Sequence, residues 1–223
     1  MNVDLPASTL MANVIEMEKQ TEGFNEFVSA AELGDSKKVL SMIRRGADVN
    51  KPDATGWTAL IAAADAGHVN MIKGLCGHPD IQVNLQNKEK ESALMRAVLA
   101  GHTDTTKALL AAPDIAVNAK TSTGKSALIL AAAMGQAGIT SALLVADGIE
   151  LNAVDLDGKT ALIRACENGH YDTALLLLVT DDIEIDVADA SGKTALAHAT
   201  ERGHQDIAEL IEEMKKEQLA SSG

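Results

Sequence analysis

The stretch "DLDGKTALIRACENGH", residues 155–170, decides how this chain folds, because close relatives of it recur along the sequence. They are "DATGWTALIAAADAGH" (53–68), "NKEKESALMRAVLAGH" (87–102), "TSTGKSALILAAAMGQ" (121–136) and "DASGKTALAHATERGH" (189–204). Each begins 34 residues after the previous one, which aligns a Thr or Ser column at Thr58, Ser92, Ser126, Thr160 and Thr194. A Gly column keeps the same spacing at Gly67, Gly101, Gly135, Gly169 and Gly203. A fixed period of this size is the sequence signature of a repeat architecture.

Each repeat predicts two short helices and a turn. The Thr or Ser is a candidate N-cap for an Ala-rich first helix, because its oxygen can accept one of the unpaired N–H groups there. The Gly ends that helix in the left-handed conformation. A second helix follows, such as "VNMIKGLCG" (69–77), and then an extended Ile-x-Val pair, such as Ile81 and Val83, and a turn. Two short helices cannot bury their apolar faces alone, so the units are expected to stack into a solenoid.

The composition limits the classes of function. The 223 residues carry a net charge of −13, which disfavours a nucleic-acid partner and favours a monomer that repels its own copies. The N-terminus lacks the basic start and apolar core of a secretory signal. Two cysteines, Cys76 and Cys166, lie in distant repeats, so no disulfide framework is expected. Together these features predict a cytoplasmic protein, with a nuclear location as the alternative.

The repeats resemble the ankyrin repeat, whose pattern is D-x-x-G-x-T-P-L-H-x-A-A-x-x-G-H followed by G-A-D-V-N. Residues 53–68 match it at Asp53, Gly56, Thr58, Leu60, Ala63, Ala64, Gly67 and His68, and "RRGADVNKP" (44–52) matches the connecting segment. The family's Pro is Ala in every repeat, and its helix-start His is apolar. The resemblance implies an all-α repeat solenoid of stacked helix-turn-helix units joined by hairpin-like fingers. It predicts about six units over residues 23–216, a capping helix or flexible extension at 1–22 and a flexible tail at 217–223.

Three chemical alternatives are weaker than the repeat. "AKTSTGKS" (119–126) fits a tolerant nucleotide-binding loop, but "AVDLDGKT" (153–160) repeats it one period later, which favours a finger turn. Residues 126–146 are uncharged and nearly long enough to span a membrane, but Gly135-Gln136-Ala137-Gly138 lies at their middle. The repeated histidines His68, His102, His170 and His204 lie in different units, too far apart to share a metal ion.

The resemblance therefore implies a non-catalytic protein–protein interaction module, a scaffold or adaptor, without a cofactor or metal. Its partner would bind on the concave face of finger tips and first helices. Alternatives are a regulatory or inhibitory subunit of an enzyme and, less favoured, a nucleotide-binding protein that uses the GKS and GKT turns. The candidate contact residues vary within the columns: Trp57, Asp65, Glu91, Leu99, Lys125, Met134, Lys159, Glu167, Lys193 and Arg202. Trp57 is either an interface anchor or a packing element, and the Lys row is either a contact surface or a solvated face.

Overall fold

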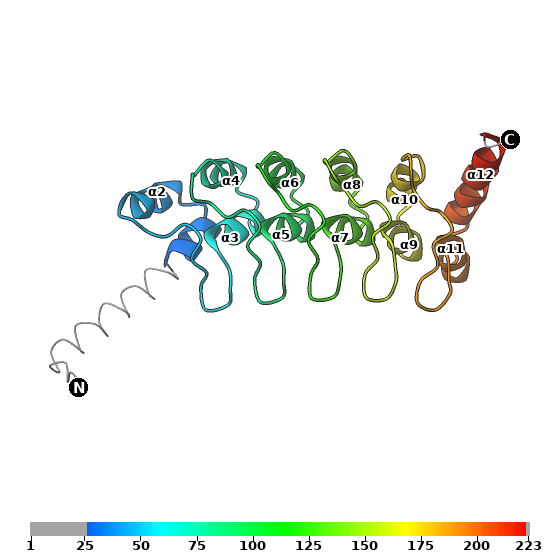
Figure 1. Ribbon diagram of the computed structural model, residues 1–223, viewed down its shortest axis with the longest axis horizontal. Helices are drawn as coiled ribbons and strands as arrows, with labels where there is room; N and C mark the ends of the chain where they lie inside the picture. The colour runs from blue at the N-terminus through cyan, green and yellow to red at the C-terminus, as the bar shows by residue number, and fades with distance from the viewer. Residues whose placement is uncertain (1–25, 222–223) are drawn as a thin grey trace, which may run out of the picture.

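The chain forms two parallel rows of short helices with finger-like turns beneath them, as Figure 1 shows for a computed structural model that describes residues 26–221. Side chains are described through residue 217. Within this part there is no strand, and the expected all-α solenoid is confirmed. The first-helix row contains residues 26–32, α3 (Ala59–Asp65), α5 (Ala93–Leu99), α7 (Ala127–Ala133), α9 (Ala161–Glu167) and α11 (Ala195–Arg202). The second-helix row contains α2 (Ser36–Arg44), α4 (Val69–Cys76), α6 (Thr103–Leu110), α8 (Ala137–Leu144), α10 (Tyr171–Leu178) and α12 (Gln205–Ser221). The helix pairs are units 1 to 6 in chain order.

The first helices begin and end as the columns predict. In unit 4, the Ser126 hydroxyl accepts a hydrogen bond from the Ile129 N–H over 3.4 Å, and the other four residues of the Thr or Ser column accept the same bond. Residues 127–132 of α7 are all buried, and the helix packs against α5 and α9. Gly135 then takes φ of +67° just after the helix. The small Ala side chains let neighbouring helices approach closely, and so they form the core of the stack.

Regularly spaced Asn side chains also form hydrogen bonds between neighbouring units. The side chain of Asn118 donates to the carbonyl of Gly148 over 2.7 Å and accepts from the N–H of Glu150 over 2.9 Å. Asn50, Asn84 and Asn152 make the same two bonds to the next unit in each case. The sequence pattern predicted that the Ile-x-Val pairs beside this column are extended. That prediction was wrong for the second residue of the pair, because the chain turns at Val83 and Asn84, and Val83 lies in the core.

In units 2, 3 and 5, the repeated histidine hydrogen-bonds to the unit before it. His102 hydrogen-bonds through Nε2 to the carbonyl of Asp65 over 3.0 Å, and His170 bonds to the carbonyl of Ala133 over 3.1 Å. The ring of His170 also lies directly against Gly135. These histidines therefore pack and hydrogen-bond between units instead of gathering around a metal ion.

The two ends differ in what the structure describes. The expected capping segment at 1–22 lies outside the described residues. At the other end, α12 continues to Ser221, so residues 217–221, expected in a flexible tail, are helical. The reason is local, because "EEMKKEQLA" contains only good helix formers and no Gly or Pro. Ile207 and Ile211 anchor this helix in the core.

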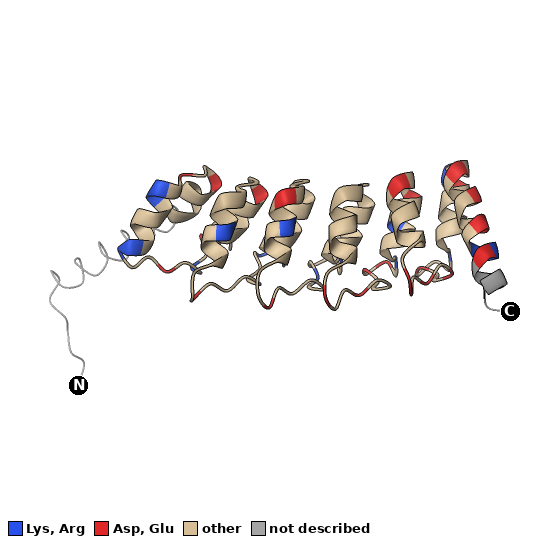
Figure 2. Ribbon diagram, turned by 90° about the horizontal axis from the view of Figure 1, so that it is seen from above, with Lys and Arg blue, Asp and Glu red and all other residues tan. Residues whose placement is uncertain are grey.

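The uncharged stretch 126–146 divides into α7, a turn and α8. Along residues 26–221 no helix has both the length and the apolar character that crossing a bilayer requires. Both helices of unit 4 lack charged residues, and in Figure 2 α8 stands out as uncharged among its neighbours.

Candidate functional site

The fingers and the exposed side of the first helices together form one surface, which we name the finger face. The same type of turn forms the finger in each of units 2 to 6. In unit 5, Asp155 Oδ1 accepts from the backbone N–H groups of Asp157 and Lys159 over 2.9 and 3.1 Å. Asp53, Asn87, Thr121 and Asp189 occupy the same position and use a side-chain oxygen in the same way. This turn fixes the residue just before each N-cap at the base of its finger.

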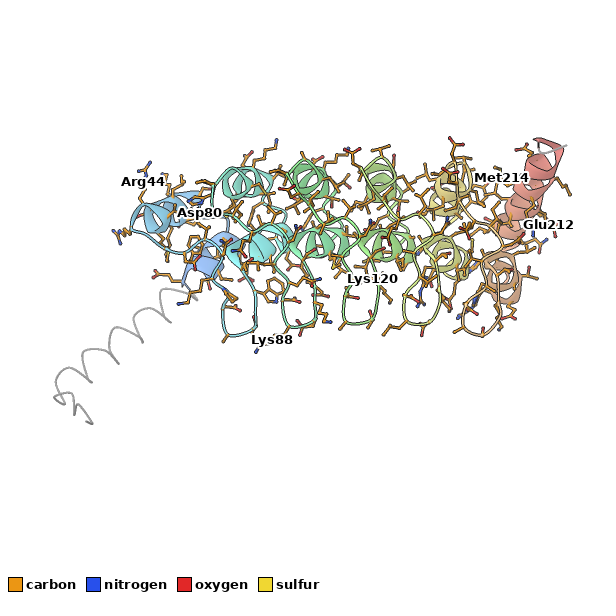
Figure 3. All side chains as sticks on the ribbon, viewed as in Figure 1. Arg44, Asp80, Lys88, Lys120, Glu212 and Met214 are labelled. Carbon is orange, nitrogen blue, oxygen red and sulfur yellow. The ribbon has the colours of Figure 1, made fainter. Side chains whose placement is uncertain are left out.

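Neighbouring fingers are also bonded to one another. Lys88 and Lys120, labelled in Figure 3, each donate through Nζ to a finger carbonyl of an adjacent unit, those of Ala54 and Val154. The backbone N–H of Leu156 donates to the carbonyl of Thr123 over 3.3 Å. The fingers therefore form one continuous, pre-organised surface rather than separate loops.

A charged cluster lies between units 2 and 3. The guanidinium of Arg96 donates to Asp65 over 3.0 Å and to Glu91 over 3.2 Å. It also lies 5.0 Å from the ring centroid of Trp57, within the range of a cation–π contact. Trp57 is half-buried and packs against the core. Three predicted contact residues are thus brought together here by an arginine that the sequence pattern did not single out.

A second charged cluster covers unit 5 and reaches unit 6. Arg164 donates to Asp155 over 2.8 Å and to Glu167 over 3.4 Å, while Lys159 bonds Glu167 over 2.8 Å. Arg202 of the next unit reaches the same Glu167 over 3.2 Å. Burial alone would raise the pKa of Glu167, but the Lys159 hydrogen bond and the charges of Lys159 and Arg164 outweigh it and lower that pKa. Glu167 is therefore ionised and held by three cations.

Unit 6 continues this pattern with two pairs. Lys193 bonds Glu201 over 2.6 Å, and the buried His198 bonds the buried Asp189 over 2.7 Å. The Ser191 hydroxyl, which bonds Asp189, has the largest effect in lowering the pKa of that carboxyl; burial opposes the effect, and the His198 bond adds to it. The net result is a carboxylate whose pKa lies well below its usual range.

Unit 4 interrupts the charged surface with apolar side chains. Where unit 5 has Arg164 and Glu167, unit 4 has Leu130 and Ala133. Met134 is 46% exposed, and Leu99 of unit 3 is half-buried. Lys125, the equivalent of Lys159, is half-buried, and within residues 26–217 no carboxylate pairs with its ammonium group.

The GKS turn of unit 4 does not present a phosphate cradle. The N–H groups of Thr123, Gly124 and Lys125 all donate to Thr121, and the N–H of Ser122 donates to Glu89 in the preceding finger. A nucleotide-binding loop needs those groups directed at the phosphates. The turn is thus a finger like its neighbours.

Other reactive groups do not gather on the described part of the chain. Among residues 26–217, no three side chains of the metal-ligating types lie close enough to hold an ion. Cys76 and Cys166 are free thiols, and burial raises the pKa of Cys166 to about 12. Such a thiol is almost wholly protonated at neutral pH.

All ten predicted contact residues lie in the described region, and all belong to the finger face or its edge. The structure adds a column that the sequence prediction missed, the fourth residue of each first helix: Ala62, Arg96, Leu130, Arg164 and His198. Its period of 34 residues was visible in the sequence, and its variation from apolar to basic was the signal. The ion-pair partners of these residues could not be predicted from the residue types at one repeat position.

Comparison with known proteins supports the same architecture. The model of the ankyrin-repeat family matches residues 27–121, 77–155, 114–189 and 150–219, which together span most of the chain. The chain belongs to the ankyrin-repeat family. No curated protein matches it.

Solved structures resemble this chain closely in fold, and two of those compared are named as ankyrin-repeat proteins. An ankyrin repeat domain from Acinetobacter baumannii superposes with a TM-score of 0.77 at 26% identity, covering 85% of this chain and 97% of that one. The ankyrin repeat protein EF0377 gives 0.77 at 26% identity over 84% and 96%. A chain in the structure of a predatory endopeptidase from Bdellovibrio bacteriovorus in complex with an immunity protein gives 0.74 at 26% over 84% and 96%. Ankyrin arrays are protein–protein interaction modules, and this chain shares that general character.

Proposed function

We propose that this protein is a non-catalytic scaffold or adaptor that binds a protein partner on its finger face. The observation that carries the proposal is the contrast between framework and surface. The Thr or Ser caps, the Gly residues and the Asn side chains that bond neighbouring units keep the same chemistry, whereas the finger face changes from an Arg–Trp cluster to an apolar patch to an Arg–Glu cluster. A regular framework that carries a varied surface supports selective recognition rather than chemistry.

Several features support a protein as the partner. The net charge of −13 disfavours nucleic acid. The finger face combines aromatic, Met and Arg side chains, the types that are enriched at protein interfaces. We further infer that the protein acts as a monomer in the cytoplasm or nucleus, where the free thiols of Cys76 and Cys166 would stay reduced.

Affinity purification of the tagged protein followed by mass spectrometry tests the proposal. A partner that this step recovers is then titrated against the wild type and a variant with Lys159→Glu and Arg164→Glu on the finger face. Loss of binding by this variant supports the proposal. Unchanged binding would exclude the cluster on unit 5 as part of the interface. The matched control is Lys107→Glu on α6, which changes charge on the second-helix row.

A second candidate function is a regulatory or inhibitory subunit of an enzyme. It is supported by the likeness to a chain in the complex of a predatory endopeptidase with an immunity protein. This candidate predicts that the recovered partner is an enzyme whose turnover falls when this protein is added in equal amount. Turnover that is unchanged at saturating protein would leave the scaffold function as the better explanation.

A further inference from the structure

In two neighbouring units the finger face pairs a lysine at the base of the finger with a glutamate eight residues later. Lys159 bonds Glu167 over 2.8 Å in unit 5, and Lys193 bonds Glu201 over 2.6 Å in unit 6. The turn at the finger base and the start of the first helix are the same in both units. The spacing therefore places an ammonium group and a carboxylate together wherever both residues are present.

Unit 4 keeps the lysine and lacks the glutamate. Lys125 sits in the same turn, held by the bond from its N–H to Thr121, but the residue eight positions later is Ala133. The fourth residue of α7 is Leu130, whereas the fourth residue of α9 in unit 5 is Arg164. Lys125 is thus a half-buried cation beside an apolar helix, and within residues 26–217 its ammonium has no carboxylate partner.

Apolar residues occupy the column positions that are expected next to this cation. Met134 is 46% exposed at the end of α7. In the next two units the residues at its column reach back to the preceding unit, Asn168 to the carbonyl of Ala133 and Arg202 to Glu167. The same register places Met134 next to Leu99, the residue of unit 3 that is equivalent to Ala133 in unit 4 and Glu167 in unit 5. By equivalence with units 5 and 6, we infer that Leu99, Ala133 and Met134 form an apolar patch, and the Lys159–Glu167 pair one unit later places Lys125 at its border.

We propose that this patch and Lys125 bind an extended segment of the partner protein that carries one carboxylate beside an apolar side chain. The partner's Asp or Glu would occupy the place that Glu167 fills in unit 5, and its apolar side chain would cover Leu99 and Met134. A single carboxylate fits better than an acidic run, because the net charge of −13 repels a polyanionic segment. The inference rests on the proposed function and specifies the partner's chemistry.

The test is a selection of random linear peptides displayed on phage against the full-length wild-type protein. Enriched peptides are synthesised, and their dissociation constants are measured by fluorescence anisotropy. We expect the enriched sequences to share one Asp or Glu near a Leu, Met or Phe. Replacement of that acid by its amide should weaken binding about tenfold, because a desolvated charge pair loses its partner.

Two variants at one position separate charge from bulk. Ala133→Glu recreates within the chain the pair seen in unit 5, so it should neutralise Lys125 and weaken peptide binding about tenfold. Ala133→Gln adds nearly the same volume without the charge and should change affinity by less than about threefold. Lys125→Gln should match Ala133→Glu, while Lys107→Gln on α6, in the second-helix row, should leave affinity within about threefold.

Four other outcomes would overturn the inference. Equal losses from Ala133→Glu and Ala133→Gln would show that bulk matters and exclude the role of Lys125. Selected peptides without an acid, or no selected peptide, would overturn the inference while leaving the proposed function to the partner recovered by affinity purification. A dimer in sedimentation velocity that Ala133→Glu dissociates would identify a second copy as the occupant and overturn the assignment to another protein.

Discussion

The contact between His170 and Gly135 gives the sharpest prediction about stability. A Cβ atom added at Gly135 would lie 2.5 Å from Nδ1 and 2.7 Å from Cγ of His170, far inside van der Waals contact. Cγ is attached near the backbone of His170, so the ring cannot rotate away cheaply. Any rotation also breaks the 3.1 Å hydrogen bond from its Nε2 to the carbonyl of Ala133. Gly135→Ala should therefore disturb the packing and the hydrogen bond between units 4 and 5.

Gly101 is the matched control. It takes nearly the same φ, +76° against +67°, at the same column one unit earlier. Its neighbour from the next unit is Gln136 instead of a histidine, and a Cβ there would lie 3.5 Å from Nε2, an ordinary contact. Gly101→Ala should cost only the left-handed backbone conformation, about 1–2 kcal/mol. Gly135→Ala adds overpacking of about 1–3 kcal/mol, giving about 2–5 kcal/mol in total.

The assay is urea unfolding followed by far-ultraviolet circular dichroism for both variants. A third variant isolates the effect of the ring, because His170→Gln reproduces the surroundings of Gly101. In that background, Gly135→Ala should cost about as little as Gly101→Ala does. Equal costs for the two Ala variants in the wild-type background would refute the predicted clash, since backbone strain alone would then explain both.

Three further predictions concern single side chains. Thr173 has a buried hydroxyl without a hydrogen-bond partner in the described structure, so Thr173→Val should raise the free energy of unfolding by about 1 kcal/mol in the same urea assay. Because the pKa of Asp189 is lower in the folded protein, its carboxylate stabilises the fold fully above the unfolded pKa of about 3.9, and this stabilisation is lost as the pH falls toward the folded pKa. Asp189→Asn loses the charge that faces His198, so the stability difference between this variant and the wild type should shrink below about pH 4. A difference that stays constant with pH would contradict this. Iodoacetamide at pH 8 should alkylate Cys76 well before Cys166, whose pKa is about 12 and whose thiol is fully buried, and equal rates in the native protein would show that the core opens.

The periodic residues predicted the framework because each has a local cause. The Ser126 column caps helices by a bond within four residues, and the Gly135 column needs a conformation that Gly alone adopts cheaply. Such causes act at short range and repeat with the sequence. The turn at Val83 was not predicted because an alternating Ile-x-Val pattern looks the same in a strand and in a buried turn.

The surface could be predicted only in part. Its residues were found as column positions that vary, but their partners lie across units or across a helix. The bond from Arg96 to Asp65 spans 31 residues, and Arg96 covers Trp57, which the sequence alone left open as an anchor or a packing element. The lack of a glutamate opposite Lys125 became visible only when the Lys159–Glu167 pair was seen one unit away.

The recognition of a protein by the finger face is tested most directly by hydrogen exchange of the complex with the recovered partner. We predict slower amide exchange on binding in the fingers and first helices, above all in residues 119–134, which include α7. Exchange in the second helices, such as α8 (Ala137–Leu144), should stay as in the free protein. Protection confined to the second helices, with exchange in the fingers unchanged, would contradict recognition by the finger face.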